Sequence, residues 1–393
     1  MACIPLYIVL FLFIKLSSAD DCVINNIGKN ASWELQLIKH LRCNYNSRYP
    51  PNTNESFVEV NAKFMMKYFN FDATEELFSI HTWLILYWVD DRLKWTPENY
   101  GGLEKIDIYN HNIWYPALRL MNGDAEFDYK DVYMVPCTIE HTGDVTCLQI
   151  IYDNTVCSTK LWDWPYDSQV CKLEVGVWKY PMKKINIIFA KKAVNMLVAG
   201  YGGEWDITDY KQEEDQGSNT QLRIFFTLER HGEILAAITI YPAVIFGVLT
   251  LTSLMIDVRR NLRLGLICFS LANQLLQLNV LAELIPKHSA AHPSLVLYYR
   301  GSIILTILVV LLSIILKSLC RKDKMPSALI ERVSDYVVNS RLKYIIWKWE
   351  YEEEKCKVWM DFASLINSVV LYVFTITYIC MYAVYVPQPI PFN

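Results

Sequence analysis

The segment Cys157-Ser-Thr-Lys-Leu-Trp-Asp-Trp-Pro-Tyr-Asp-Ser-Gln-Val-Cys171 decides how the rest of this chain is interpreted. Its two cysteines bracket about thirteen residues, a loop that a disulfide closes without a large core. Inside it, Trp164-Pro165-Tyr166-Asp167 sets a proline between two rings. Proline fixes φ, and the rings give the loop an apolar tip that must pack against another part of the protein. The alternative at this point is a chance cysteine pair around a turn.

Composition and hydropathy indicate an exported protein that lies partly in a membrane. The mean hydropathy is positive, which is unusual for a soluble protein. The net charge of −4 gives no indication of nucleic-acid binding. Residues 1–19 form an apolar run that ends in small residues, which predicts a signal peptide. The sequons at Asn30 and Asn54 predict glycosylation of an exported surface.

The cysteine count supports the same compartment. Six cysteines fall between the signal peptide and the first apolar span: Cys22, Cys43, Cys137, Cys147, Cys157 and Cys171. An even count in an exported domain predicts disulfides. The residues between Cys137 and Cys147 include the turn signal Thr142-Gly143-Asp144, so we expect these two to face each other across a hairpin. Elimination then leaves Cys22 with Cys43, and the alternative for either of these two pairs is free thiols.

The first half of the chain is typical of a β-sandwich. A short helical pattern runs from Asp20 to Cys43, with apolar residues at helical spacing. From Phe57 to about Thr227 the pattern changes to short β-type runs, such as Thr82–Trp88 and Ile185–Phe189, with turn residues between them. Many short strands at regular spacing predict an extracellular immunoglobulin-like sandwich, preceded by the short helix, over residues 20–233.

The second half predicts a helical four-span transmembrane domain over residues 234–393. The apolar runs 234–256, 264–285, 295–316 and 362–386 are each long enough to cross the hydrocarbon. A polar cytoplasmic link, 317–361, separates the last two. Basic residues gather in this link and in the short link after the first span, so the positive-inside rule places both links in the cytoplasm. The amino terminus and the carboxyl terminus then lie outside the cell.

An exported sandwich with four spans and a cysteine-closed aromatic–Pro–aromatic loop resembles the Cys-loop family of pentameric ligand-gated ion channels. The nicotinic acetylcholine-receptor branch is the most similar. The matching segments run through the mature chain: Trp88–Gly102, Trp114-Tyr-Pro116, Glu174–Trp178, Glu204-Trp205-Asp206 and Ala282–Pro286. The resemblance implies a channel subunit at the plasma membrane, postsynaptic in location, that assembles with other receptor subunits and is gated by a small cationic transmitter such as acetylcholine. It also implies that the Trp164–Asp167 loop transmits binding to the spans.

Other functions are less well supported. No Gly-rich phosphate loop or zinc spacing is present and the seven histidines are scattered, so we predict no enzyme activity, cofactor or metal. Two rival functions stay open at this point. One is a non-conducting auxiliary subunit that assembles with others, and the second is a membrane-anchored binding protein without a pore.

The resemblance also implies which residues bind the transmitter. Trp178 matches the aromatic-box tryptophan of the principal face, and Trp83 matches the tryptophan of the complementary face. Met121 stands in place of one family tyrosine, and the late tyrosine of the capping loop corresponds to about Asn219. The adjacent cysteine pair of that loop is missing. With one face altered and the other intact, we predict a non-alpha subunit that works in hetero-oligomers.

The second span shows a similar departure. The family register predicts a pore lining at i+3 and i+4 spacing: Gly265, Phe269, Ala272, Leu276, Asn279 and Glu283. Leu262 stands where cation channels of this type carry an acidic ring, and Ala272 replaces the central leucine. Polar residues form a second stripe, rotated by about one residue: Ser270, Asn273 and Gln277. This stripe either lines the pore or faces neighbouring helices and hydrogen-bonds there.

Overall fold

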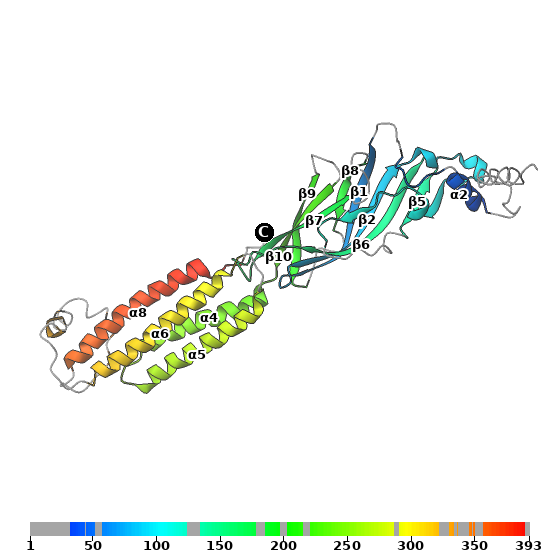
Figure 1. The fold of residues 1–393 in the computed structure, drawn as a ribbon. Coiled ribbons are helices and arrows are strands. Elements are labelled where there is room, and N and C mark those ends of the chain that lie inside the picture. The colour runs from blue at the N-terminus through cyan, green and yellow to red at the C-terminus, as the bar shows by residue number, and fades with distance from the viewer. Residues whose placement is uncertain are drawn as a thin grey trace, which may run out of the picture.

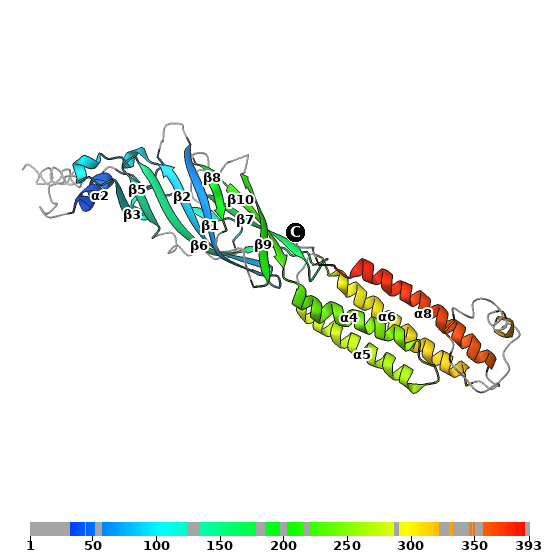
Figure 2. The same cartoon turned by 180° about the vertical axis from the view of Figure 1, so that it is seen from behind.

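A computed structural model describes residues 32–43, 45–51, 57–123, 134–177, 185–196, 203–214, 221–286, 291–321, 330–333, 336, 346–347, 349 and 357–389. These residues form a β part and a helical part that lie end to end (Figure 1). The view from behind shows the strands ending where the helices begin (Figure 2). The chain passes from one part to the other between β10 (Gln221–Arg230) and α4 (Glu233–Ser253).

The β part is a two-layer sandwich with the short helix α2 (Trp33–Cys43) at its far end (Figure 1). One sheet has the strand order β3-β5-β6-β2-β1-β8, with bounds Lys105–Tyr109, Pro136–Glu140, Asp144–Val156, Leu77–Val89, Val58–Asp72 and Ile185–Asn195. The other has the order β4-β7-β10-β9, with bounds Leu118–Leu120, Ser168–Val177, Gln221–Arg230 and Trp205–Glu214. Short 3₁₀ turns occur at Asp91–Leu93, Pro97–Tyr100 and Asn110–Asn112. The predicted sandwich is therefore confirmed.

Alternation along the strands builds the core between the sheets. In β2, even-numbered residues such as Leu84 are buried and odd-numbered residues are partly exposed. Period-2 burial is what a sheet with one face on a core requires. Phe78 of one sheet meets Phe226 of the other with 5.7 Å between ring centroids. The strand β1 pairs antiparallel with β2 and parallel with β8, and its register with β2 shifts between Met66 and Tyr68.

Two disulfides lie within the described residues. Cys157 is bonded to Cys171 with a Cα–Cα distance of 5.2 Å, as the spacing predicts. Cys137 is bonded to Cys147, its register partner across β5 and β6, with a Cα–Cα distance of 4.1 Å. A pairing of Cys22 with Cys43 involves residue 22, which lies outside the described residues. The signal peptide 1–19 and the sequons at Asn30 and Asn54 lie outside them as well.

The helical part contains four helices that are long and apolar enough to cross a membrane. They are α4, α5 (Asn261–Leu284), α6 (Ser294–Leu319) and α8 (Lys357–Tyr385). Each overlaps one predicted span and begins before it. The reason is that hydropathy marks the part in hydrocarbon, whereas polar residues such as Asn261 extend the helix beyond it. The helices run side by side in both views (Figures 1 and 2).

Candidate functional site

The strand β2 presents Trp83 on the outward face of the six-stranded sheet. The strand register places Trp83 between Met65 of β1 and Ile150 of β6. Its chain neighbours Thr82 and Leu84 point into the core and have no exposure, whereas Trp83 is half-buried. Trp83 therefore lies where a neighbouring protein can contact its ring.

The surroundings of Trp83 are aromatic and apolar. Ile150 is 55% exposed, Tyr68 57% and Tyr152 73%, so large apolar groups stand in solvent on this face. The Lys67 ammonium nitrogen lies 3.9 Å from the centroid of the Trp83 ring. We call this surface the Trp83 face, and its residues are Met65, Lys67, Tyr68, His81, Trp83, Ile150 and Tyr152. A contiguous exposed apolar patch indicates an interaction surface.

The other predicted ligand residues do not join this face. Trp178 and Asn219 lie outside the described residues. Met121 follows β4 in the other sheet, where its backbone N–H donates to the carbonyl of Glu174 at 2.7 Å. The structure thus places Trp83 and Met121 on different sheets, and the chain presents two separate surfaces.

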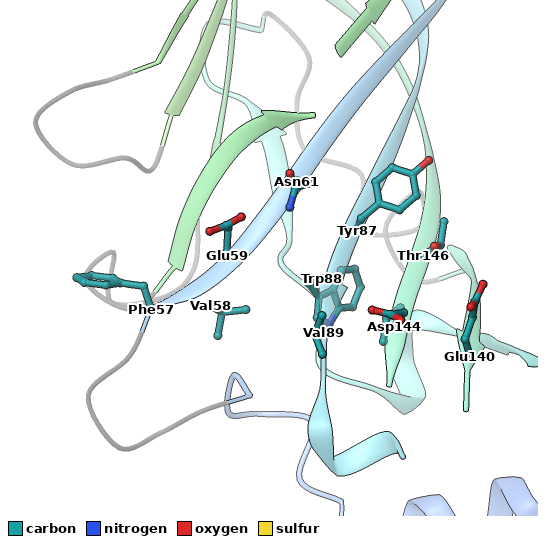
Figure 3. Close-up of a pocket in the computed structure, with 11 residues that line it drawn as sticks. Phe57, Val58, Glu59, Asn61, Tyr87, Trp88, Val89, Glu140, Asp144 and Thr146 are labelled. Carbon is teal, nitrogen blue, oxygen red and sulfur yellow. The ribbon is translucent and has the colours of Figure 1, made fainter. Parts of the chain in front are cut away.

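A cavity of about 610 Å³ lies further along the outward face of the same sheet. Tyr87 and Val89 of β2 and Thr146 of β6 help to line it, and none of the predicted ligand residues does. Figure 3 shows the carboxylates of Glu59 and Asp144 spread across the strands rather than gathered at one point. Within the described part of the chain, no group of His, Cys, Asp or Glu is suited to hold a metal ion.

The tip of the Cys157–Cys171 loop is buried in the helical part. Trp164 is 1% exposed and packs in a cluster that also contains Ile240 of α4, Leu281 of α5 and Tyr298 of α6. The aromatic tip is therefore packed against apolar residues of the helices, as its residue types predict. Burying a tryptophan in this way fixes the loop to three helices that come from widely separated parts of the sequence.

Hydrogen bonds just before the tip, and a close backbone contact at the tip, also hold this loop against the helical part. The Ser294 N–H and hydroxyl, at the start of α6, both donate to the carbonyl of Trp162, at 3.0 and 2.8 Å. The Leu161 N–H donates to the carbonyl of Ala291 at 3.3 Å. Close to α4, Gly232 lies so near the Pro165 carbonyl that a Cβ would overlap it. The loop is therefore in direct contact with the chain at the starts of α4 and α6.

A buried ion pair ties the loop to the last strand. Arg230 Nε donates to Asp167 Oδ1 at 2.8 Å, and their side chains are 4% and 1% exposed. The Arg230 guanidinium also bonds to Glu204 and lies 4.1 Å from the centroid of the Trp205 ring. The sequence motifs did not mark Arg230 as a functional residue. The signal available in the sequence was the basic residue Arg230 just before the first span, together with the oppositely charged Asp167 at the end of the loop tip.

The faces of α5 divide into two sets. All six predicted pore residues are exposed in the single chain, so they point away from the other helices: Gly265, Phe269, Ala272, Leu276, Asn279 and Glu283. Ser270 is fully buried, with its hydroxyl 2.9 Å from that of Thr250 in α4. Gln277 donates to the Ile238 carbonyl of α4 at 2.5 Å. At Ser270 and Gln277 the polar stripe therefore faces neighbouring helices, one of its two predicted orientations.

Arg263 points away from the exposed face of α5 into the ends of the bundle. It is 1% exposed, and its guanidinium donates to Ser313 of α6 at 3.1 Å and to Asn367 of α8 at 2.9 Å. It also donates to the Ile256 carbonyl at 3.2 Å. Leu262, its neighbour, is 64% exposed. Hydrogen bonds to neutral groups from three elements make Arg263 a structural residue of the bundle.

Comparison with known proteins identifies the class. Residues 34–232, about half of the chain, match the model of the neurotransmitter-gated ion-channel ligand binding domain. The chain therefore belongs to the Cys-loop receptor family, which confirms the resemblance carried by the Cys157–Cys171 loop.

Individual relatives agree with this membership. The chain is 24% identical over 300 residues to the acetylcholine receptor subunit beta-type unc-29 of Caenorhabditis elegans, covering 75% of this chain and 60% of that protein. It is 24% identical over 309 residues to the neuronal acetylcholine receptor subunit beta-3 of Gallus gallus, covering 75% and 67%. It is 26% identical over 196 residues to the human neuronal acetylcholine receptor subunit alpha-2, covering 49% and 37%. The matches thus span less than two thirds of the length of two of these relatives, 60% and 37%.

Proposed function

We propose that this chain is a subunit of a nicotinic-like pentameric ligand-gated ion channel at the cell surface. The observation that carries the proposal is the Cys157–Cys171 loop, whose Trp164 tip is buried among α4, α5 and α6 and whose Asp167 pairs with Arg230. A protein that is only anchored in the membrane needs no such contact. A channel does, because ligand binding shifts a closed–open equilibrium only if the two parts move together.

The transmitter site that we propose lies between subunits. The Trp83 face would form the complementary side, since an ammonium group is attracted to an exposed indole ring by about 0.5–2 kcal/mol. The chain's own principal side, with Met121, Asn219 and Trp178, lacks the family tyrosines and the adjacent cysteines. This supports a non-alpha subunit that borrows the principal side from a partner and binds a small cationic transmitter such as acetylcholine.

The pore that we propose is lined by the exposed face of α5, from Gly265 to Glu283. That face has no packing partner among the described helices, as expected if five copies or partners close around an axis. We further propose that residues 20–233 are extracellular and residues 234–393 form the membrane domain. Both termini would then lie outside, with 317–361 in the cytoplasm.

Electrophysiology on cells expressing the full chain tests this function. We expect no acetylcholine current from the chain alone and a current when an alpha-type partner is co-expressed. In that mixed assembly, Trp83→Ala should raise the half-maximal acetylcholine concentration at least about threefold. Tyr109→Ala, an exposed tyrosine of β3 outside the Trp83 face, is the matched control for loss of aromatic area.

Three results would contradict the proposal. A robust acetylcholine current from the chain alone would overturn the non-alpha assignment. If assemblies that contain this chain reach the surface but the chain takes no part in conducting the current, the non-conducting auxiliary subunit would be favoured. Surface expression as a monomer, with or without a partner, would favour the membrane-anchored binding protein.

A further inference from the structure

We propose that Lys67 is an internal cation that occupies the ring face of Trp83, so that an ammonium ligand binds there only by displacing it. This inference rests on the proposed function for its physiological meaning. The Lys67 nitrogen lies 3.9 Å from the ring centroid, well within the distance at which a cation is attracted by the π-system. The ammonium group of Lys67 therefore already lies against the tryptophan that would bind the transmitter.

A β-bulge places Lys67 over the ring. Met66 pairs with Thr82 and Tyr68 pairs with His81, so Lys67 is the extra residue in β1 and has no register partner in β2. The bulge leaves two successive residues, Lys67 and Tyr68, on the outward side, where regular alternation would turn one inward. Bulges redirect side chains in this way and occur often next to functional sites.

The charge of Lys67 is directed to the ring and to solvent. Within the described part of the chain, Lys67 forms no ion pair with a carboxylate, and its contact is the Trp83 ring. Lys63, four residues earlier on the same face, pairs in register with Ile85, and no aromatic ring of the described residues lies beneath its ammonium group. An unneutralised ammonium at Trp83 both fills the ring face and repels a second cation.

Tethering strengthens this competition. An ammonium held by its own side chain has an effective concentration far above that of a diffusing transmitter, so it occupies the ring whenever nothing else does. Removing the charge while keeping the length of the side chain should free the ring. We expect Lys67→Met to strengthen binding of small ammonium ligands by about three- to thirtyfold.

A first experiment tests the contact without requiring channel activity. The purified full-length chain is labelled with 5-fluorotryptophan, and the Trp83 resonance in the ¹⁹F spectrum is assigned by its loss in Trp83→Phe. Tetramethylammonium chloride is the probe, with sodium chloride at equal ionic strength as the reference. The Trp83 resonance should shift in Lys67→Met and should then respond to the probe at concentrations at least threefold lower than in the wild type.

The controls make every result decisive. Lys67→Arg keeps the cation and should behave as the wild type, and Lys63→Met removes a nearby charge without uncovering a ring. The proposal is overturned if the wild type and Lys67→Met respond alike to tetramethylammonium, if neither responds, or if Lys63→Met has the effect of Lys67→Met.

A second experiment measures the consequence in the assembled receptor. In mixed assemblies with an alpha-type partner, Lys67→Met should lower the half-maximal acetylcholine concentration at least threefold, whereas Lys63→Met and Lys67→Arg should leave it unchanged. If no assembly conducts, the proposed channel function fails while the fluorine experiment still decides the role of Lys67. If assemblies conduct and the Lys67→Met response is unchanged, the inference about Lys67 fails and the channel function stands.

Discussion

Asp167 and Arg230 hold opposite charges almost entirely out of water, at the junction between the sandwich and the helices. Burying two ions is expensive unless geometry and further hydrogen bonds compensate. Here Gln169 donates to Asp167 Oδ2 at 2.7 Å, and the Trp205 ring lies beside the guanidinium. Loss of Asp167 would leave the buried Arg230 charge with Glu204, whose side chain is 54% exposed, as its remaining ion-pair partner.

Asp167→Asn should therefore destabilise the protein by up to about 3–5 kcal/mol, because the Arg230 charge stays buried with only the more exposed Glu204 left to pair with it. The measurement is thermal unfolding of the purified full-length chain, together with surface labelling of transfected cells. The matched control is Glu213→Gln, which breaks an exposed pair with Lys211 and should change stability by less than about 1 kcal/mol. Equal stability of Asp167→Asn and Glu213→Gln would show that the buried pair contributes nothing.

His231 lies next to this pair and gives the junction a pH dependence. A hydrogen bond to Asp206, at 2.6 Å, raises the pKa of His231 above its usual value. The contribution to stability is therefore fully present below the unfolded pKa, near 6.5, and is lost as the pH rises through the higher folded pKa. Because the side chain is 48% exposed, we expect a small effect.

The corresponding test compares the wild type with His231→Gln across pH. The difference in melting temperature between the two should be largest at about pH 5.5 and should shrink as the pH rises from about 6.5 through the higher folded pKa of His231. Asp206→Asn should abolish the same dependence. A difference that stays constant from about pH 5.5 to 9 would show that the His231–Asp206 contact does not titrate in this way.

Among the elements, the Cys157–Cys171 loop has the most defined role, since its disulfide fixes the base while Trp164 fixes the tip. Removing a native disulfide from an exported domain costs about 2–5 kcal/mol. Cys171→Ser should therefore abolish surface expression of the full chain, measured by labelling intact cells. Tyr152→Phe, a change outside the loop, serves as the control. Normal surface levels of Cys171→Ser would show that the bond is dispensable.

The helix α5 offers a test of its orientation. Its inward side is fixed by a buried polar cluster in which Gln274 donates to Thr306 of α6 at 3.1 Å and to Ser270 at 3.1 Å. Polar groups buried between helices are stabilised when each finds a partner, so rotating α5 would leave several unsatisfied. This explains why Ser270 and Gln274 turn inward, which leaves Phe269 and Leu276 on the side of the proposed pore.

Cysteine substitution should reveal this orientation. In a Cys268→Ser background, because Cys268 is exposed, Gly265→Cys and Ala272→Cys should react rapidly with a charged methanethiosulfonate reagent that blocks the current of mixed assemblies. Ser270→Cys, which is buried against α4 and α6, should react slowly or not at all. Equal reaction rates at positions 265 and 270 would show that α5 is rotated from the orientation described.

For the assembled molecule, the clearest consequence concerns ion selectivity. The resemblance places Leu262 where cation channels of this type carry an inner acidic ring, and Leu262 is 64% exposed beside the buried Arg263. We therefore expect this subunit to contribute no acid to that ring. Leu262→Glu should raise conductance or cation permeability of mixed assemblies, because acids at a narrow mouth concentrate cations. Reversal potentials in dilution experiments measure this, and Leu262→Gln is the uncharged control. If neither conductance nor reversal potential changes, α5 does not line the ion path at this position.

Several features of the whole molecule were predictable because their causes are local. The burial of alternate residues in β2 follows from the period of a strand, and the four helices follow from runs of apolar residues long enough for the hydrocarbon. The Cys157–Cys171 bond and the apolar loop tip follow from spacing and residue type. Trp178 and Asn219, which rest on the resemblance, stay predictions.

The sequence by itself therefore determined the order of parts, the sandwich, the spans and the Cys157–Cys171 bond. Only the tertiary structure decided three further points: the pairing of Asp167 with Arg230, 63 residues apart, the burial of Ser270 against α4, and the placement of Lys67 over Trp83. The physical reason is the same for each. Which charges meet, which side of a helix is covered and where a bulge directs a side chain depend on how distant segments pack, and local periodicity contains no information about that packing.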